Sequence, residues 1–73
     1  GEGKRVVVIG GGYLGLEIAA SAIGRGCRVT IVEREAHLMA RVMPHAIADA
    51  IEAVHRRAGV DVRLGTALAR LEG

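Results

Sequence analysis

The sequence predicts an α/β fold in which helices alternate with the strands of a parallel sheet. Three observations carry this prediction: a run of branched apolar residues at Val6–Ile9, a glycine-rich turn directly after it, and two later segments that alternate apolar and polar residues. Apolar residues at helical spacing lie between these segments, so the predicted order is strand, helix, strand, helix, strand. Right-handed crossovers then give a parallel sheet in the spatial order 3-2-1.

The first strand is predicted at Lys4–Ile9 (KRVVVI). Consecutive branched apolar residues are typical of a parallel strand that is covered on both faces. A helix follows from Tyr13 to about Arg25, because small and branched residues recur on one helical face and the glycines at 24 and 26 supply a stop. The predicted face consists of Leu14, Gly15, Ile18, Ala19, Ala22 and Ile23.

The second strand is predicted at Arg28–Glu33, where β-branched residues alternate along the chain. The connecting segment Arg34–Met43 is too apolar for a solvated loop, so we expect it to pack against the fold, either irregularly or as one helical turn. Its apolar residues are Leu38, Met39, Val42 and Met43, and we interpret both methionines as gap-filling side chains.

The second helix is predicted to start at Pro44, which suits the first helical position. Its predicted buried stripe consists of Ile47, Ile51, Val54 and Ala58, and its predicted outer face of Asp49, Glu52 and Arg56, with an ion pair between the last two. The helix ends at Gly59. A third strand is predicted at Val60–Leu64, and residues Thr66–Leu71 are expected to begin a fourth, differently placed strand.

Chain length indicates a partial domain. A chain of 73 residues buries only about 60% of its unfolded surface, which leaves a marginal core. The sequence opens with GEG and closes with RLEG, and neither has the look of a natural terminus. We therefore expect residues 1–73 to be a single partial domain from a larger protein rather than a self-sufficient enzyme.

The composition argues against nucleic-acid, membrane and metal-binding roles. The net charge is +2, and the basic residues are interleaved with 8 acidic ones beside a single aromatic, Tyr13, so no basic patch with stacking rings is available. The longest uncharged run, Val6–Leu16, is too short to cross a membrane. His37, His45 and His55 lack metal-site spacing. The lone Cys27 is predicted to be a small buried side chain, and a cytoplasmic location is the default.

Residues Gly10–Gly15 (GGGYLG) have the G-x-G-x-x-G pattern of a dinucleotide-binding turn. The pattern alone is weak, but here it follows an apolar strand, opens a helix and precedes an acid, Glu33, by 18 residues counted from Gly15. In such a turn Gly10 allows the tight bend, Gly12 lets the backbone approach a pyrophosphate, and Gly15 lets the helix pack close to the strand. The prediction is therefore one half of a three-layer, doubly wound, Rossmann-like fold (βαβαβ), a partial FAD/NAD(P)-binding domain.

Glu33 is placed to accept hydrogen bonds from the adenosine ribose hydroxyls. Its charge repels a 2′-phosphate and so favours NAD(H) over NADP(H), although the next residue, Arg34, has the charge to pair with that phosphate. The alternative is that the glycines only make a tight turn and that Glu33 is an exposed acid at the end of a strand. Spacing alone also leaves open whether Glu17 is more than a dipole-stabilised acid early in the helix, and whether the ring of Tyr13 covers the site or is simply on the surface.

Residues Val6–Glu35 (VVVIGGGYLGLEIAASAIGRGCRVTIVERE) resemble the NAD(P)H-binding domain of the flavin-dependent pyridine nucleotide-disulfide oxidoreductase superfamily. Residues His37–Gly65 (HLMARVMPHAIADAIEAVHRRAGVDVRLG) are similar to its ferredoxin, rubredoxin and putidaredoxin reductase branch. The resemblance implies that this domain delivers hydride from the nicotinamide to FAD in another domain, and that the flavin passes single electrons to a small iron-sulfur protein. It also implies that Tyr13 lies near the nicotinamide channel, that Glu17 orients the nicotinamide, and that Glu33 binds the ribose.

The candidate cofactor-binding residues are Gly10, Gly11, Gly12, Tyr13, Leu14, Gly15, Glu17, Glu33 and Arg34. No catalytic residue is assigned, because the cofactors carry the chemistry, and the fragment alone is expected to bind a dinucleotide without turnover. Two other functions stay open. One is a non-catalytic module that senses dinucleotide occupancy, and the other is the FAD-binding unit of an oxidoreductase, which Glu17 and the Tyr-Leu-Gly order disfavour.

Overall fold

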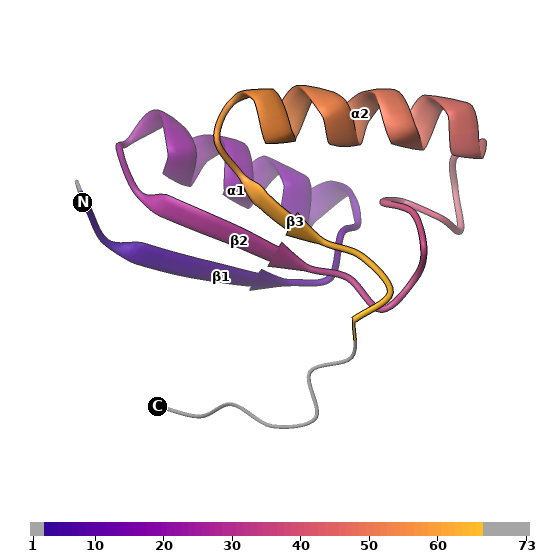
Figure 1. The fold of residues 1–73 in the computed structure, drawn as a ribbon, viewed down its shortest axis with the longest axis horizontal. Helices are drawn as coiled ribbons and strands as arrows, with labels where there is room; N and C mark the ends of the chain where they lie inside the picture. The colour runs from indigo at the N-terminus through magenta and orange to yellow at the C-terminus, as the bar shows by residue number, and fades with distance from the viewer. Residues whose placement is uncertain (1–2, 67–73) are drawn as a thin grey trace.

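The computed structural model describes residues 3–66 of the 73-residue chain. Its elements follow the predicted order and are, as Figure 1 shows, β1 (Arg5–Ile9), α1 (Tyr13–Gly24), β2 (Arg28–Val32), α2 (His45–Arg57) and β3 (Asp61–Arg63). The strands form one parallel sheet in the order β1-β2-β3, which confirms the predicted α/β class and strand order. The predicted fourth strand lies, apart from Thr66, outside the described residues.

The core lies between the sheet and the two helices. Val6 of β1 pairs with Val29 of β2, and Val8 pairs with Ile31, which pairs in turn with Val62 of β3. Alternate residues of a strand share one face, so these five side chains form a continuous apolar layer under the helices. Ile31 at its centre is completely buried, as expected for the middle strand.

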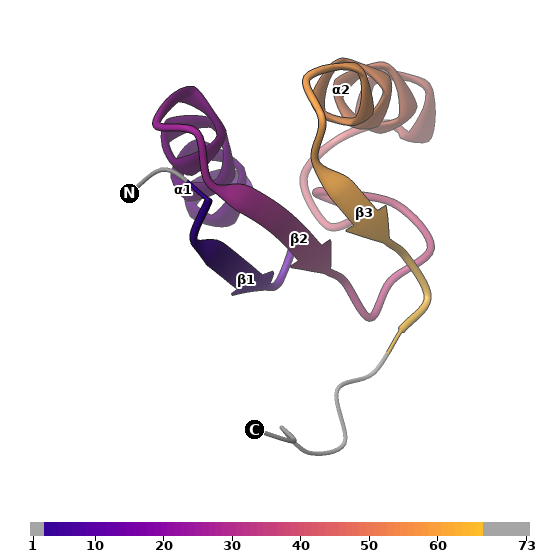
Figure 2. The same ribbon diagram turned by 60° about the vertical axis from the view of Figure 1, so that its left-hand side comes forward.

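Both helices cover the same face of the sheet, as the two views in Figures 1 and 2 show. The described residues therefore form two of the three expected layers. The prediction that the first strand is covered on both faces is wrong for these residues, because Val7 is 48% and Ile9 63% exposed on the opposite face. The physical reason is that two successive right-handed crossovers in one direction place both helices on one side.

The predicted face of α1 is confirmed in part, because Gly15 lies close to β1, Ala19 is buried, and Ala22 and Ile23 pack against the core. Leu16 and Ala19 are buried, but Leu14 is 68% and Ile18 47% exposed. Leu14 and Ile18 line a hollow along β1 instead of entering the core. The residues at fourfold spacing therefore lie in two environments: Leu14 and Ile18 face the free edge of β1, whereas Ala22 packs against the core.

The predicted buried stripe of α2 is confirmed only at Ile51, which packs against the core. Only Ala48 of this helix is fully buried, while Ile51 is partly buried and Ile47, Val54 and Ala58 are exposed. Arg56, which was predicted on the outer face of this helix, donates its Nη2 hydrogen to the backbone oxygen of Val62 at 2.7 Å. This contact links a polar residue of the helix to the edge strand β3.

The predicted ion pair on α2 is confirmed. The Nε of Arg56 donates to Glu52 Oε2 at 2.7 Å, so this arginine bonds both its helix neighbour and the strand. A side chain that was expected on the solvated face therefore fixes the helix against the sheet.

The connecting segment packs into the core as predicted. Leu38 is completely buried and Met39 is 8% exposed, whereas Val42 is 71% exposed. Helix α2 begins at His45 rather than at Pro44, because the ψ angle of 145° at the proline is extended rather than helical. The carbonyl of Pro44 nevertheless accepts the first helical hydrogen bonds. Cys27 is buried, which confirms its predicted packing role, and no helix among residues 3–66 is both long and apolar enough to cross a membrane.

Helix α1 approaches β1 so closely at Gly15 that a side chain does not fit there. An ideal Cβ on Gly15 would collide with the carbonyl oxygen of Gly10 and would lie 3.2 Å from Val8 Cγ1. We expect Gly15→Ala to lower the free energy of unfolding by about 1–3 kcal/mol, measured by urea unfolding with circular dichroism detection. Gly24→Ala is the matched control, because nothing lies within 4 Å of its ideal Cβ. Equal effects of the two substitutions would contradict the close approach.

Candidate functional site

The glycine turn lies where the carboxyl ends of β1 and β2 meet. Gly10 has a φ angle of +98°, a conformation that favours glycine, and its N–H donates to the carbonyl of Val32 at the end of β2 at 2.8 Å. The chain then turns at Gly12, the N-cap of α1, whose backbone is extended. The turn therefore presents the start of α1 at the carboxyl edge of the sheet, where open parallel sheets bind their ligands.

The start of α1 has the features of an anion-binding helix end. No side chain caps it, and its first intrahelical bond runs from the N–H of Leu16 to the carbonyl of Gly12 at 3.0 Å. The amides of the preceding helical residues have no acceptor within the helix, and the helix dipole adds positive potential there. An ideal Cβ on Gly12 would meet nothing within 4 Å, so a ligand has room to approach the backbone.

Glu33 follows β2 directly, and its carboxylate is held by backbone groups on two sides. Its Oε1 accepts the N–H of Gly11 at 2.6 Å, and its Oε2 accepts the N–H of Glu35 at 2.7 Å. An ionised carboxylate has about four acceptor positions, so each oxygen keeps one for a ligand. The bond to Gly11 also ties the end of β2 to the glycine turn.

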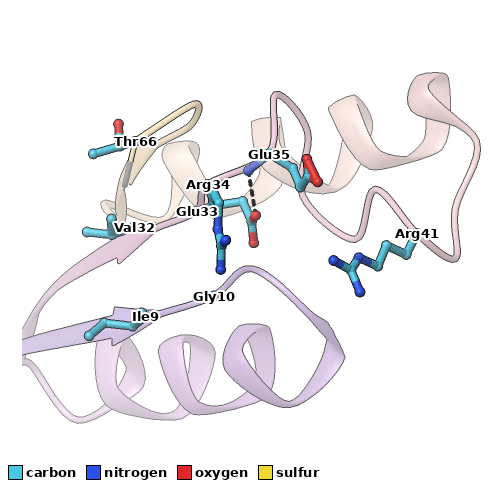
Figure 3. Close-up of a pocket in the computed structure, with 8 residues that line it drawn as sticks. All are labelled: Ile9, Gly10, Val32, Glu33, Arg34, Glu35, Arg41 and Thr66. Carbon is cyan, nitrogen blue, oxygen red and sulfur yellow. Dashed lines mark hydrogen bonds between the residues drawn. The ribbon is translucent and has the colours of Figure 1, made fainter. Parts of the chain in front are cut away.

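A hollow of about 550 Å³ opens beside this carboxylate, and Figure 3 shows the side chains around it. Its walls come from the ends of β1 and β2 and from the connecting segment, and Arg41 extends toward it from that segment. The lining residues are Ile9, Gly10, Val32, Glu33, Arg34, Glu35, Arg41 and Thr66. Two carboxylates and two guanidinium groups are thus gathered at one edge of the sheet.

The connecting segment forms a second wall against the glycine turn. The N–H of Met39, a residue with a φ angle of 51°, donates to the carbonyl of Gly11 at 2.8 Å. Leu38 packs under the same glycine, and its Cδ2 would lie only 2.5 Å from an ideal Cβ on Gly11. Between segment and turn lies a hollow of about 260 Å³ that is lined by Gly12, Glu33 and Arg41 among others.

Most of the predicted site residues come together. The three glycines of the turn, with Tyr13, Glu33 and Arg34, line the two hollows around the Glu33 carboxylate. Gly15 lies beneath the turn and Leu14 beside the free edge of β1. Glu17 is not among them, because this exposed residue lines a separate apolar hollow of about 320 Å³ between α1 and α2, which Tyr13 also lines.

Two charged residues in the hollow were not predicted from the sequence. Glu35 and Arg41 line it, yet both belong to the connecting segment, where no periodicity marks which side chains turn inward. The signal that was available is weak: a basic residue eight positions after the acid at the end of β2. Arg41 follows two residues after Met39, whose left-handed φ angle the sequence does not predict.

The arrangement suits a ligand that carries both an anionic group and vicinal hydroxyls. The uncapped start of α1 and the side chain of Arg41 border one hollow, which the fixed carboxylate of Glu33 also lines. Among residues 3–66 no group of three or more His, Cys, Asp or Glu side chains is placed to hold a metal ion. The open space at Gly12 and the uncapped helix leave room and N–H groups for an anionic group.

Comparison with known proteins gives close similarities. Terpredoxin reductase from a Pseudomonas species is 48% identical over 65 residues, which are 89% of this chain and 16% of that protein. The crystal structure of the covalent putidaredoxin reductase–putidaredoxin complex superposes with a TM-score of 0.94 and 44% identity over 97% of this chain and 17% of the solved chain. The water-forming NADH oxidase from Lactobacillus brevis, bound to NADH, gives a TM-score of 0.85 and 36% identity over 90% of this chain and 15% of that one.

The chain thus spans about a sixth of the length of these relatives. The sequence profile of one family, described as pyridine nucleotide-disulphide oxidoreductase, matches all of residues 1–73. The chain therefore belongs to the pyridine nucleotide-disulphide oxidoreductase family.

Proposed function

We propose that residues 1–73 are the NADH-binding segment of a longer flavin-dependent oxidoreductase, in which hydride passes from NADH to FAD and electrons go on to a ferredoxin-like iron-sulfur protein. The observation that carries the proposal is the Glu33 carboxylate, which is bonded to Gly11 N–H beside the uncapped start of α1. A sugar-binding acid and a phosphate-binding helix end are thereby held at a fixed separation, as a dinucleotide requires.

The pyrophosphate is proposed to lie against the first amides of α1. Gly12 leaves the approach open, and the helix end offers N–H groups and positive potential to the charge. Arg41 lines both hollows and so is placed to add a full positive charge beside the phosphates. Glu33 accepts the ribose hydroxyls with the acceptor positions that its two backbone bonds leave unused.

The preference for NADH over NADPH follows from the same carboxylate. A 2′-phosphate would have to lie where Glu33 is held in place, and two anions in contact repel each other. Arg34 lines the same hollow and reduces this repulsion, so the preference is a balance between neighbouring opposite charges. Because the carboxylate is fixed by backbone groups while Arg34 is exposed, we assign the larger influence to Glu33.

The nicotinamide and the flavin supply the hydride chemistry, and this chain positions the donor. Tyr13, 68% exposed, and the exposed Glu17 are proposed to face the nicotinamide end, because both line the hollow between α1 and α2, which Glu33 does not line, and Tyr13 also borders the hollow beside Glu33. The iron-sulfur partner is proposed from relatives whose names include terpredoxin reductase and a complex with putidaredoxin. The cytoplasmic location stays a prediction of the sequence.

The complete natural chain tests the proposal directly. We expect the purified protein to show the visible absorbance of oxidised flavin, and we expect this absorbance to bleach when NADH is added under anaerobic conditions. A chain that binds NADH but contains no flavin would instead support a sensing module. Flavin binding at Glu33 itself, shown by loss of flavin in a Glu33 variant with intact NADH binding, would support the FAD-binding alternative.

Removal of the Glu33 side chain is expected to weaken NADH binding. In the complete protein, Glu33→Ala should raise the dissociation constant for NADH by the equivalent of about 1–3 kcal/mol, because the ribose hydroxyls lose their acceptors. The affinity for NADPH should fall less than the affinity for NADH, or should rise, because the charge that repels the 2′-phosphate is removed. The matched control is Glu35→Ala, which removes an equal charge from the same hollow and keeps the N–H that binds Glu33. Calorimetric titration measures both, and equal losses for the two variants would refute the ribose role.

A side chain at position 12 is expected to block binding and spare the fold. The φ angle of −82° and ψ angle of −179° at Gly12 are accessible to valine, and nothing lies within 4 Å of the ideal Cβ. Gly12→Val should therefore keep a near-normal melting temperature and lose at least about tenfold in NADH affinity, or about 1.4 kcal/mol. Normal NADH affinity in a correctly folded Gly12→Val protein would show that the pyrophosphate lies elsewhere.

A further inference from the structure

A cluster of three polar side chains fastens the connecting segment to the start of α2. His37 Nδ1 lies 2.8 Å from Asp49 Oδ1, and the rings of His37 and His45 are stacked with centroids 3.8 Å apart and planes 15° from parallel. His45 and Asp49 are one helical turn apart on α2, so both contacts come from one rigid element. None of these three residues lines either hollow around Glu33.

The hydrogen bond fixes the ring of His37. A carboxylate only accepts, so the Nδ1 atom of His37 carries the proton and donates to Asp49. The stack with His45 then restricts the ring from one face. Nearly parallel stacked rings direct their in-plane lone pairs side by side rather than toward a common point, so the pair does not chelate a metal ion.

The cluster is close in sequence to the contacts that shape the site. Leu38 and Met39 follow His37 directly, the first buried under Gly11 and the second donating its N–H to the Gly11 carbonyl. Two residues further on, Arg41 lines both hollows. A tether at His37 therefore restrains the segment immediately before the point where it meets the glycine turn.

We propose that His37, bonded to Asp49 and stacked on His45, is a positioning residue for dinucleotide binding. This His37 clasp holds the connecting segment against the glycine turn, which keeps the Met39 contact closed and Arg41 beside the phosphate position. The inference rests on the proposed function, because its effect on affinity requires that the glycine turn binds a dinucleotide. The clasp itself consists of the side chains at positions 37, 45 and 49.

The expected size of the effect follows from the exposure of the pair. The side chains of His37 and Asp49 are 27% and 56% exposed, and exposed polar pairs of this kind change an equilibrium by at most about fivefold. Apparent affinity falls in proportion to the fraction of molecules in the binding-competent arrangement. Loss of the clasp is therefore expected to raise the KM for NADH by about two- to fivefold.

The test uses the complete, flavin-loaded protein and the variant Asp49→Ala. We expect a higher KM for NADH, an unchanged kcat at saturating NADH, and faster amide hydrogen exchange in residues 38–43. Alanine has a higher helix propensity than aspartate, so α2 itself should not be weakened and the melting temperature should not fall. Asp49→Asn keeps an acceptor oxygen for His37 and should restore most of the NADH affinity.

The control is Glu52→Ala, which removes an ion pair of the same helix, at 2.7 Å from Arg56, without touching the connecting segment. An unchanged KM in Asp49→Ala, or an equal rise in Glu52→Ala, overturns the clasp. Hydrogen exchange separates this outcome from failure of the proposed function. If the wild-type protein binds no NADH, the proposed function fails and the role of the clasp in affinity fails with it. Faster amide exchange at residues 38–43 in Asp49→Ala would still demonstrate the tether, and unchanged exchange would refute it.

Discussion

The close approach of α1 to β1 at Gly15 is the constraint on which the rest of the ligand-facing edge depends. Because no Cβ intervenes, the first turn of the helix lies directly against the carbonyl of Gly10, and no side chain caps its first amides. The turn then leaves Gly11 N–H at the reach of Glu33, 22 residues later in the chain. The absence of a side chain at Gly15 thus allows a helix end and a strand end that are distant in sequence to lie together. The hollow forms between these two ends.

The order of the elements and the position of the turn could be predicted from residues 4–65, because these features depend on local patterns. The turn is predicted by spacing alone, which relates the branched residues Val6–Ile9, the glycines directly after them and the acid Glu33. The parallel order follows from handedness rather than from any single side chain. These features can be predicted without knowing which residues each side chain contacts. For this reason the sequence alone predicts the glycine turn and Glu33 together.

The sequence could not predict which face of each helix is buried or how the connecting segment folds, because both depend on contacts between residues that are distant in sequence. Ile47 and Val54 have the spacing of a core stripe, but both are exposed, and Arg56 of the same helix bonds the Val62 carbonyl. Arg41 enters the site through the positive φ of Met39, an uncommon conformation that no local propensity indicates. Apolar periodicity marks a stripe; the neighbouring element decides whether the stripe is covered.

The two backbone bonds to Glu33 also bear on the thermodynamics of ligand recognition. A glutamate side chain has several rotatable bonds, and restricting them costs up to about 2 kcal/mol in lost rotamer entropy. Here that restriction is imposed when the chain folds, because Gly11 and Glu35 already hold both carboxylate oxygens. A sugar that reaches this carboxylate meets a rigid acceptor pair and gains its hydrogen bonds without ordering the side chain, which makes the geometry of its hydroxyls, rather than the adaptability of the protein, the basis of selection.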